Sequence, residues 1–584
     1  MTPALSVEDL TVSFKGRGGT EVTAVEGLSF SLAPGEVLGL VGESGSGKST
    51  VGLAAMGLHD PARTRVSGSV LVGGEEVVGA PESSVRALRG SRIAMVFQDA
   101  LAALSPFHTV GAQLAEAYRV HAPAGAGRRA DAREKALDML ERVGIPAARA
   151  RDYPHQFSGG MRQRVMIATA LVNRPDVLIA DEPTTALDAR VQRQVLELLA
   201  ELREESGTAV LLVTHDVGVV AGTCDRMLVM RGGRGLEEGP TRKLLTDAAH
   251  PYTRALIGAA PTLNTVPGTR LPTVDDPGPL APGGGAAPAG AGHGLSVAPA
   301  GRPTAESGGA GRTSAGAQGA AAPARPLAEA VDLHVEFGGR RRLLRSGHGA
   351  VQAVRGVSLR IDPGETLGLV GESGSGKSTT ARVLAGLQRP TSGDVRFDGR
   401  DITRAAADTR LRRELSRDVQ LVFQDPYASL NPRRTVEEIV TTPLRVHTGL
   451  DKGERRARAA ELLEQVGLRA AHLHRYPHEF SGGQRQRIGI ARALALRPRL
   501  VIADEPVSAL DVSVQAQVLN LLMDLRDELG LSLLFVSHDL AVVRHFCDRV
   551  AVMRAGSVVE SGPRDEVFGD PKAPYTRELL AATM

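Results

Sequence analysis

The chain of 584 residues has no tryptophan and only two cysteines, Cys224 and Cys547. Two thiols cannot build a disulfide scaffold, nor a metal site with three or more cysteine ligands. Basic and acidic residues nearly balance, at 69 and 66, and the net charge of +3 gives no general sign of nucleic-acid binding. The scarcity of cysteine excludes a small disulfide-stapled protein, and the near balance of charge excludes a strongly basic nucleic-acid binder.

The sequence also lacks an apolar run long enough to cross a bilayer. Its first residues, MTPALSVEDL, do not follow the pattern of a signal peptide. We therefore expect a protein that stays inside the cell and serves a membrane only through partners.

What the chain does contain is the nonapeptide GESGSGKST, twice. Each copy fits the pattern G-x-x-x-x-G-K-[ST] and follows a short apolar run, Val37–Val41 or Thr366–Val370. A strand, a glycine loop and a helix start turn successive backbone N–H groups toward one point, which forms a phosphate-binding loop. A purely structural glycine turn does not account for two identical copies with the same flanks. The predicted loops comprise Gly42, Glu43, Ser44, Gly45, Ser46, Gly47, Lys48, Ser49 and Thr50, and Gly371, Glu372, Ser373, Gly374, Ser375, Gly376, Lys377, Ser378 and Thr379.

Further motifs repeat in the same order along the chain. A Phe-Ser-Gly-Gly motif, an Asp-Glu-Pro motif and a His-Asp pair each occur once in either half. The spacing from the motif serine to the aspartate is 23 residues in both halves, and from that aspartate to the histidine it is 34. Such a long internal repeat predicts a duplicated, two-domain ATPase.

Hydrophobic patterns predict an α/β fold for each copy. Alternating patterns in LSVEDLTVSF and TAVEGLSFSL favour an antiparallel sheet. Mostly apolar strands precede the phosphate loop, Asp181 and His215, and such runs suit a sheet that helices bury on both faces. Apolar residues at helical spacing predict a helix over residues 191–202.

The two copies are separated by a segment of low complexity. Within residues 281–324, 37 of 44 positions are Ala, Gly, Pro, Ser or Thr. This composition cannot bury enough apolar surface to offset the entropy lost on ordering. We therefore assign residues 1–260 to a first domain, residues 261–326 to a flexible linker and residues 327–584 to a second domain. The linker's r.m.s. reach of roughly 45 Å would join two facing domains.

Hydrolysis of a triphosphate needs charge neutralisation, a positioned water and stabilisation of the developing charge. Each loop lysine would reach the β- and γ-phosphates. The predicted Mg²⁺ ligands are Ser49, Gln98 and Asp181 in the first copy and Ser378, Gln424 and Asp504 in the second. The predicted catalytic residues are Glu182 and Glu505 at the attacking water, Gln98 and Gln424 at metal and water, and His215 and His538 at the γ-phosphate. A lone strand-end histidine is more often structural, but its recurrence at one spacing favours the catalytic reading.

This succession of motifs resembles the ATP-binding-cassette (ABC) ATPases over the whole chain except the linker. The resemblance implies two cassettes, each with a mixed core sheet, an antiparallel β subdomain and a helical subdomain. In that family each ATP lies between one cassette's phosphate loop and the other's SGG motif. The residues expected to act from the opposite cassette are Ser158, Gly159, Gly160 and Met161, with Asp188, and Ser481, Gly482, Gly483 and Gln484, with Asp511. Phe14 and Phe337 resemble the aromatic residue on which adenine stacks, although a simple core phenylalanine fits these positions almost as well.

Finer motifs resemble the two ATPases of dipeptide, oligopeptide and nickel importers. YPHQFSGGMRQR at 153–164 is similar to the first ATPase, QDPYASLNP at 424–432 to the second, and His-Pro-Tyr-Thr-Arg and Ala-Pro-Tyr-Thr-Arg to the C-terminal motif of both. The resemblance implies ATP and Mg²⁺ as cofactors, two permease subunits, an extracytoplasmic solute-binding protein and a place on the cytoplasmic side of the membrane. It implies no nucleic-acid partner. Many first ATPases carry a cysteine-rich tail for an iron–sulfur cluster, but here that region has no cysteine, and we expect no cluster.

Two other functions fit the same motifs. Soluble tandem ABC ATPases act on ribosomes or nucleic acid, but they usually join their cassettes by a long charged helical segment. An exporter ATPase is not distinguished from an importer by motif chemistry. The transported peptide or solute is not readable from this chain, because selectivity belongs to the permeases and the binding protein.

Overall fold

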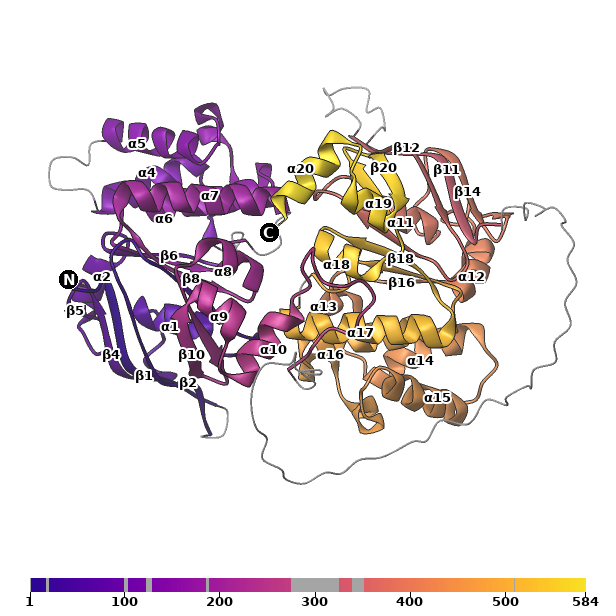
Figure 1. Ribbon diagram of the computed structural model, residues 1–584, viewed down its shortest axis with the longest axis horizontal. Coiled ribbons are helices and arrows are strands. Elements are labelled where there is room, and N and C mark those ends of the chain that lie inside the picture. The colour runs from indigo at the N-terminus through magenta and orange to yellow at the C-terminus, as the bar shows by residue number, and fades with distance from the viewer. Residues whose placement is uncertain are drawn as a thin grey trace, which may run out of the picture.

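The computed structural model describes residues 2–16, 20–98, 103–121, 129–184, 189–274, 325–338, 351–508 and 510–583. Two halves of the same architecture lie side by side, the first in indigo to magenta and the second in orange to yellow (Figure 1). The duplication and the α/β class predicted from the sequence are therefore confirmed.

Each half contains an antiparallel sheet and a mostly parallel one. In the first half the antiparallel sheet has the order β2-β1-β4-β5 and the second sheet the order β10-β9-β3-β8-β7-β6, in which only β10 runs antiparallel to its neighbour. The strands are β1 (Leu5–Lys15), β2 (Glu21–Leu32), β3 (Val37–Val41), β4 (Thr64–Val72), β5 (Glu75–Glu76), β6 (Ile93–Val96), β7 (Val177–Asp181), β8 (Ala209–Thr214), β9 (Arg226–Arg231) and β10 (Arg234–Pro240).

The second half repeats this arrangement, with the orders β12-β11-β14-β15 and β16-β17-β18-β13-β19-β20. Its strands are β11 (Ala328–Phe337), β12 (Val351–Ile361), β13 (Thr366–Val370), β14 (Ser392–Phe397), β15 (Arg400–Asp401), β16 (Val419–Val422), β17 (Leu500–Asp504), β18 (Ser532–Ser537), β19 (Arg549–Arg554) and β20 (Ser557–Pro563).

The parallel strands are buried because both faces of their sheet are covered. All five residues of β3 are buried. Its side chains alternate between two cores: Leu38 and Leu40 belong to the one shared with the antiparallel sheet, and Val37 and Val41 to the other. Continuous apolar runs are therefore what this sheet requires.

Helices connect and cover these sheets. The first half has α1 (Lys48–Ala55), α2 (Glu82–Leu88), α4 (Val110–His121), α5 (Arg129–Arg142), α6 (Gly159–Leu171), α7 (Ala189–Ser206), α8 (Val217–Thr223), α9 (Thr241–Asp247) and α10 (Pro251–Ala259). The second has α11 (Lys377–Leu384), α12 (Thr409–Asp418), α13 (Pro426–Ser429), α14 (Val436–His447), α15 (Lys452–Gln465), α16 (Gly482–Leu494), α17 (Val512–Leu529), α18 (Leu540–Phe546), α19 (Arg564–Gly569) and α20 (Pro574–Ala582).

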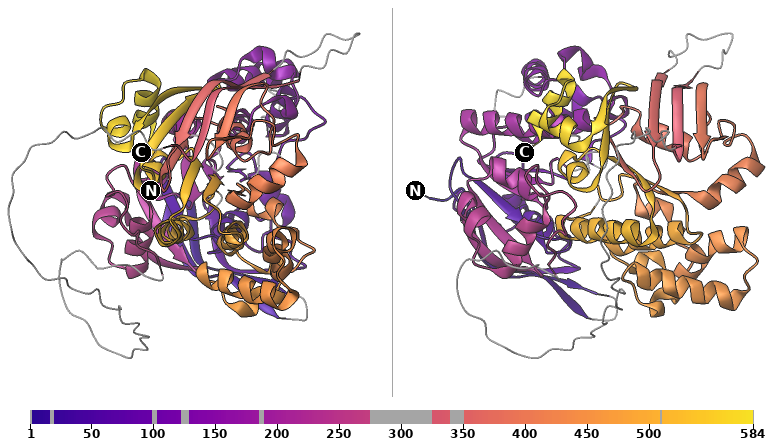
Figure 2. Two further views of the ribbon diagram at one scale, coloured as in Figure 1. Left: turned by 90° about the vertical axis from the view of Figure 1, so that its right-hand side faces the viewer. Right: turned by 45° about the vertical axis from the view of Figure 1, so that its right-hand side comes forward.

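The expected helical subdomain is present in both halves, where α4 packs on α5 and α6, and α14 on α15 and α16 (Figures 1 and 2). The helix predicted over residues 191–202 is α7, which continues to Ser206. Over the described part of the chain, no helix combines the length and the hydropathy needed to cross a membrane.

The halves touch through helices that each extends toward the other. Helix α10 packs on α17, and α20 packs on α7 (Figure 1). At the second of these contacts the Arg193 guanidinium donates to the carbonyl oxygen of Ala581 over 2.6 Å. Ala259 of α10 is buried within the core of the second half. The interface therefore contains the same kind of helix contact twice, once from the last helix of each half.

A third contact overturns part of the linker prediction. Residues 261–274, which we name the strap, pack on the second half. Leu271 is buried in that half's core. Its N–H donates to Asn520 Oδ1 (2.9 Å), and its carbonyl accepts from Asn520 Nδ2 (2.8 Å). Arg270 pairs with Asp524 at 3.0 Å, and the Gly268 N–H donates to the carbonyl of His545 at 2.9 Å. The assigned linker began at residue 261, but contacts with α17 and α18 order its first 14 residues. The rest of the predicted linker, residues 275–324, lies outside the described residues.

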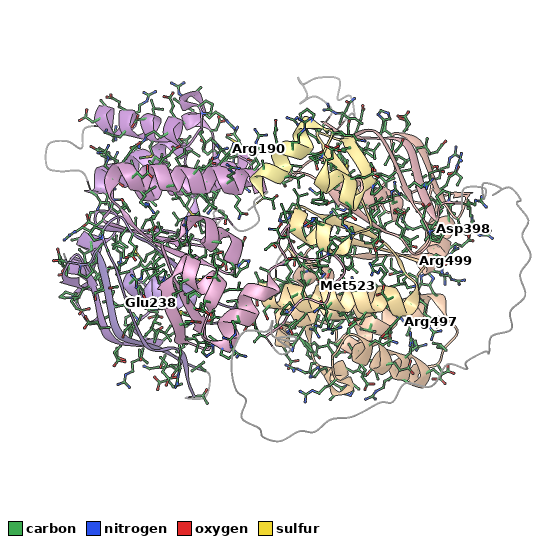
Figure 3. The ribbon with its side chains drawn as sticks, viewed as in Figure 1. Arg190, Glu238, Asp398, Arg497, Arg499 and Met523 are labelled. Atoms are coloured by element: carbon green, nitrogen blue, oxygen red, sulfur yellow. The ribbon has the colours of Figure 1, made fainter. Side chains whose placement is uncertain are left out.

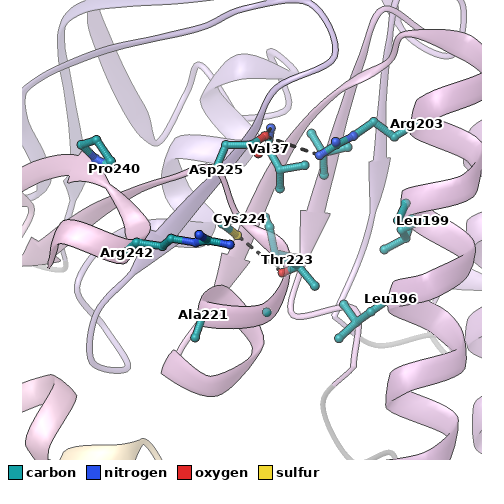
Figure 4. A pocket seen from close by; sticks show the side chains of 14 residues that line it. Val37, Leu196, Leu199, Arg203, Ala221, Thr223, Cys224, Asp225, Pro240 and Arg242 are labelled. Carbon is teal, nitrogen blue, oxygen red and sulfur yellow. Dashed lines mark hydrogen bonds and ion pairs between the residues drawn. The ribbon is translucent and has the colours of Figure 1, made fainter. Parts of the chain in front are cut away.

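The matching groove in the first half has no such cover among the described residues. A pocket of about 600 Å³ lies between α7 and α8, and Leu196, Leu199, Thr223 and Cys224 line it (Figure 4). When the halves are aligned at Cys224 and Cys547, Phe546 takes the place of Thr223, and it is buried in the core of the second half. Burial raises the pKa of the Cys224 thiol to about 12, so this thiol stays protonated at neutral pH.

Candidate active sites

The two phosphate loops join a buried strand to a helix, as predicted. Helix α1 begins at Lys48 after Gly47, whose φ of 98° lies in the left-handed region, and a Cβ there would meet the carbonyl of Ala24 at 2.4 Å. Only glycine fits this position. Gly376 has the same role before α11, with φ 103°. The loop geometry thus depends on a glycine that the motif fixes.

Each loop lysine is buried and directed into its own loop. Lys48 Nζ donates to the carbonyls of Gly42 (2.7 Å) and Glu43 (2.8 Å), and Lys377 Nζ donates to those of Gly371 (2.7 Å) and Glu372 (2.9 Å). Burial lowers the pKa of Lys48, and the surrounding carboxylates of Glu182, Asp511, Asp181 and Glu43 oppose that shift.

A serine and an aspartate meet at the end of each loop. Ser49 Oγ donates to Asp181 Oδ1 (3.0 Å), and Ser378 Oγ donates to Asp504 Oδ1 (2.9 Å). Burial raises the pKa of both carboxyl groups, and the neighbouring glutamate charge adds to the effect. A hydroxyl and a carboxylate suit Mg²⁺, which prefers oxygen ligands and would stabilise the charged carboxylate. The donor set therefore fits the predicted metal.

The glutamate that follows each aspartate is held by the predicted glutamine and histidine. Gln98 Nε2 donates to Glu182 Oε2 (2.6 Å), while His215 Nδ1 lies 2.9 Å from Glu182 Oε1. In the second half, Gln424 Nε2 donates to Glu505 Oε2 (2.9 Å), and His538 Nδ1 lies 3.3 Å from that oxygen. In each half, the structure therefore brings together a glutamine, a glutamate and a histidine that belong to separate sequence motifs.

Backbone strain accompanies both glutamates. Their φ angles are 48° for Glu182 and 47° for Glu505, in the left-handed region that non-glycine residues rarely adopt. The Glu182 N–H donates to the carbonyl of Val213 (2.8 Å) and the Glu505 N–H to that of Val536 (2.9 Å), so the neighbouring strand fixes the turn. Strained residues held in this way cluster at functional sites.

Burial opposes the charged form of His215, but the hydrogen bond and charge of Glu182 outweigh it and raise the histidine's pKa. The same balance raises the pKa of His538 beside Glu505. Burial alone would raise the pKa of Glu505, but the bond to His538 lowers it. The glutamate beside each histidine therefore raises that histidine's pKa, and in the second pair the pKa of the glutamate is lowered in return.

The SGG motifs begin helices. Ser158 caps α6 by accepting from the Met161 N–H, and Ser481 caps α16 by accepting from the Gln484 N–H, each over 3.4 Å. Ser158 and Ser481 are exposed, as a surface meant for a partner must be. Their expected pairing with the opposite phosphate loops, together with Gly159, Gly160, Gly482 and Gly483, stays a prediction.

Several charged groups approach the active sites across the interface. The carboxylate of Asp511, from the second half, acts to raise the pKa of both Lys48 and His215 in the first. A cavity of about 600 Å³ between the halves is lined by His215 and His538 and by the aspartates that follow them. The equivalent Asp188 lies outside the described residues.

The two aromatic residues expected at adenine differ. Phe14 is partly buried against the core, with its ring edge-on to that of His59 at 5.7 Å between centroids. Phe337 is 45% exposed at the end of β11. Their role toward adenine stays a prediction.

Sequence reasoning missed a tyrosine at each loop. The hydroxyl of Tyr575 accepts a hydrogen bond from the backbone N–H of Glu372, over 3.4 Å, and Arg554 lies over its ring at 4.6 Å. Tyr252 holds the equivalent position, with Arg231 at 4.8 Å, and burial raises its pKa to about 12. Both tyrosines belong to the Pro-Tyr-Thr-Arg motifs, which the sequence analysis used only as a sign of family resemblance. The recurrence of a tyrosine at the same place in both halves could have indicated a role at the phosphate loops.

Comparison with known proteins agrees with this geometry. The model of the family described as "ABC transporter" matches residues 25–185 and 354–508, which together span the loops, glutamates and SGG motifs of both halves. The chain belongs to the ABC transporter family. A second model, "Oligopeptide/dipeptide transporter, C-terminal region", matches residues 236–281 and 559–584 of this ABC protein. Both halves are thus ABC ATPase cassettes, and the first of the C-terminal matches includes the strap.

Curated relatives share the tandem length of this ABC protein. The Mycobacterium tuberculosis "Oligopeptide transport ATP-binding protein OppD" is 48% identical over 609 residues, covering 100% of this chain and 98% of the relative. "Glutathione import ATP-binding protein GsiA" of Escherichia coli K12 is 45% identical over 592 residues, covering 99% and 89%. A solved structure of the dimeric ATP-binding cassette MJ0796, bound to ADP and Pi, is 31% identical, covers 41% of this chain and 98% of that one, and has a TM-score of 0.37.

Proposed function

We propose that this protein is the ATPase subunit of an importer for di- or oligopeptides or a related small solute. It is similar over its whole length to an oligopeptide transport ATP-binding protein and a glutathione import ATP-binding protein, and both halves match the C-terminal region of oligopeptide/dipeptide transporters. The observation that carries the proposal is the duplicated catalytic set, in which lysine, serine, aspartate and a histidine-held glutamate recur with the same contacts.

In the proposed mechanism, each half contributes the phosphate loop and metal ligands for one ATP. Lys48 and Lys377 exchange their loop carbonyls for the β- and γ-phosphates. Ser49 with Asp181, and Ser378 with Asp504, would hold Mg²⁺, whose charge would neutralise that of the phosphates. The backbone N–H groups of the loop and the first turn of the helix complete the anion site.

Glu182 and Glu505 activate the attacking water. Each carboxylate accepts a hydrogen bond from the water and takes up its proton as the phosphoryl group is transferred. Gln98 and His215 hold Glu182 from two sides, which keeps a strained residue in one orientation. Gln424 and His538 do the same for Glu505.

We infer that the two sites are composite, with Ser481 facing the first loop and Ser158 the second. The influence of Asp511 on Lys48 and the histidine-lined cavity between the halves support this head-to-tail pairing. Closure around two ATP molecules then alternates with opening after hydrolysis, a two-state change biased by the nucleotide.

The proposed partners are two different permease subunits and an extracytoplasmic solute-binding protein, with this chain peripheral on the cytoplasmic face. The stretch after each glutamine, which leads to the SGG motif, would receive a permease segment. It spans 60 residues from Gln98 to Ser158 and 57 from Gln424 to Ser481, as expected for two different permeases.

Uptake measurements test the proposal. Cells that lack this gene should lose accumulation of labelled di-, tri- or oligopeptides or glutathione, and a plasmid copy should restore it. A copy with Lys48→Ala and Lys377→Ala should not. Unchanged uptake of every solute, combined with ATP-dependent ribosome binding, would favour the soluble alternative, whereas increased accumulation of a solute in the deletion strain would indicate an exporter.

A further inference from the structure

A cross-interface ion pair reaches one phosphate loop and not the other. Arg190, in the first turn of α7, faces the second half (Figure 3). Its Nη1 lies 3.5 Å from Oε1 of Glu372, the second residue of the second phosphate loop. The Glu372 side chain is 28% exposed, and this oxygen accepts no hydrogen bond from the described residues. Arg190 is therefore the charge partner that the structure supplies to it.

Glu372 is coupled to the phosphate-binding lysine through its own backbone. Its carbonyl accepts from Lys377 Nζ at 2.9 Å, while its N–H donates to the hydroxyl of the buried Tyr575. A change in the position of Glu372 therefore moves an acceptor of Lys377. In addition, a carboxylate beside a polyphosphate disfavours binding by like-charge repulsion, and a guanidinium that neutralises it removes that penalty.

The first phosphate loop lacks this arrangement. Glu43 is the counterpart of Glu372, and its carbonyl likewise accepts from Lys48. The residue aligned with Arg190 is Ser513, which follows Asp511 by the same two positions as Arg190 follows Asp188. Ser513 is uncharged and only 1% exposed. Because the two loops have identical sequences, the difference between the sites comes from the opposite half.

We propose that Arg190 is a positioning residue that acts across the interface to strengthen nucleotide binding at the second site alone. The two ATP sites of this chain are then unequal, with the site around Lys377 filling at lower ATP concentration than the site around Lys48. This inference rests on the proposed composite sites and adds a residue and a direction to them.

The test measures nucleotide labelling of each half separately. Full-length protein is photolabelled with radioactive 8-azido-ATP and Mg²⁺ over a range of concentrations, cut at a protease site inserted within residues 285–315, and resolved on a denaturing gel. In the wild type the C-terminal fragment should reach half-saturation at a lower concentration. Arg190→Ser, which copies the first site's serine, should raise that concentration about two- to fivefold, the range of partly exposed ion pairs, and leave the N-terminal fragment unchanged.

Three variants distinguish positioning from general loosening of the interface. Arg190→Lys keeps the charge and should retain most of the preference. In a Glu372→Gln background, Arg190→Ser should have no further effect, because the pair is already absent. Arg193→Ala, the matched control one helical turn along α7, removes a contact to Ala581 and should leave both half-saturation values unchanged.

The outcomes are decisive. Equal half-saturation of the two fragments in the wild type, no shift with Arg190→Ser, or the same shift with Arg193→Ala would overturn the inference. Failure of the proposed sites looks different: neither fragment would label, or labelling would survive Lys48→Ala and Lys377→Ala.

Discussion

Replacing Asn520 with alanine tests whether the strap holds the two halves together. The Asn520 side chain receives the N–H of Leu271 and donates to its carbonyl, both in a buried setting. Alanine can make neither bond. The change lies on α17, about 250 residues from the strap in sequence, so its effect on association would arise from this contact and not from the linker.

The magnitude follows from the two backbone groups left without a partner. Each buried unsatisfied donor or acceptor costs about 1–3 kcal/mol, and partial access of water at the edge of the strap reduces the total to about 2–4 kcal/mol. At 1.4 kcal/mol for each factor of ten, the halves should associate roughly 30- to 700-fold more weakly.

Two substitutions in the strap itself give reference values for this loss of association free energy. Leu271→Ala removes an apolar side chain that is 3% exposed in the core of the second half, and should cost about 2–5 kcal/mol. Arg270→Ala breaks an ion pair with Asp524 whose side chains are 63% and 46% exposed, and should cost at most about 1 kcal/mol, or about fivefold. Arg270→Ala should therefore weaken the association of the halves much less than Asn520→Ala or Leu271→Ala.

The assay cuts the linker and asks whether the fragments separate. Protease cleavage between residues 285 and 315, without nucleotide, is followed by sedimentation at several concentrations. Wild-type fragments should stay associated, and Asn520→Ala or Leu271→Ala fragments should dissociate. Glu201→Ala, at the counterpart of Asp524 on α7, is the matched control and should behave as wild type. Wild-type fragments that separate at once without ATP, or an Asn520→Ala effect no larger than that of Arg270→Ala, would refute the reasoning.

Three further predictions concern catalysis, cofactors and coupling. Glu182→Gln with Glu505→Gln should keep ATP bound while abolishing turnover, since phosphate charge is still neutralised but water is not activated; hydrolysis at the wild-type rate would disprove the assignment. Purified protein should be colourless, because two cysteines cannot supply the four thiolates of a [4Fe–4S] cluster; stoichiometric iron with absorbance near 400 nm would contradict this. Surface substitutions just beyond Gln98 or Gln424 should abolish uptake but spare basal ATP hydrolysis, and loss of both activities together would argue against a permease-docking role.

The sequence predicted those parts of the sites that local motifs determine. A phosphate loop is a contiguous segment, so its glycines, Lys48 and Ser49 could be read directly. The meeting of Gln98, Glu182 and His215 could also be anticipated, because each follows a parallel strand of one sheet, and the ends of such strands lie at one edge.

Contacts between distant segments could not be read in this way. The strap has the proline, threonine and glycine of a linker, and its order depends on Asn520 and His545, which no local pattern connects to it. Arg190 looks like an ordinary helix residue until the opposite half places Glu372 beside it. Composition describes a segment by itself, whereas these contacts depend on the surface it meets.

The strap also bears on partner choice, should the two halves ever be made as separate polypeptides. Where the second half offers Asn520, the first has Glu197, and a carboxylate has no N–H to donate to the Leu271 carbonyl. A first half carrying residues up to 274 would therefore recognise a second half in preference to another copy of itself. Cutting the gene at residue 260 instead would discard that preference together with the strap.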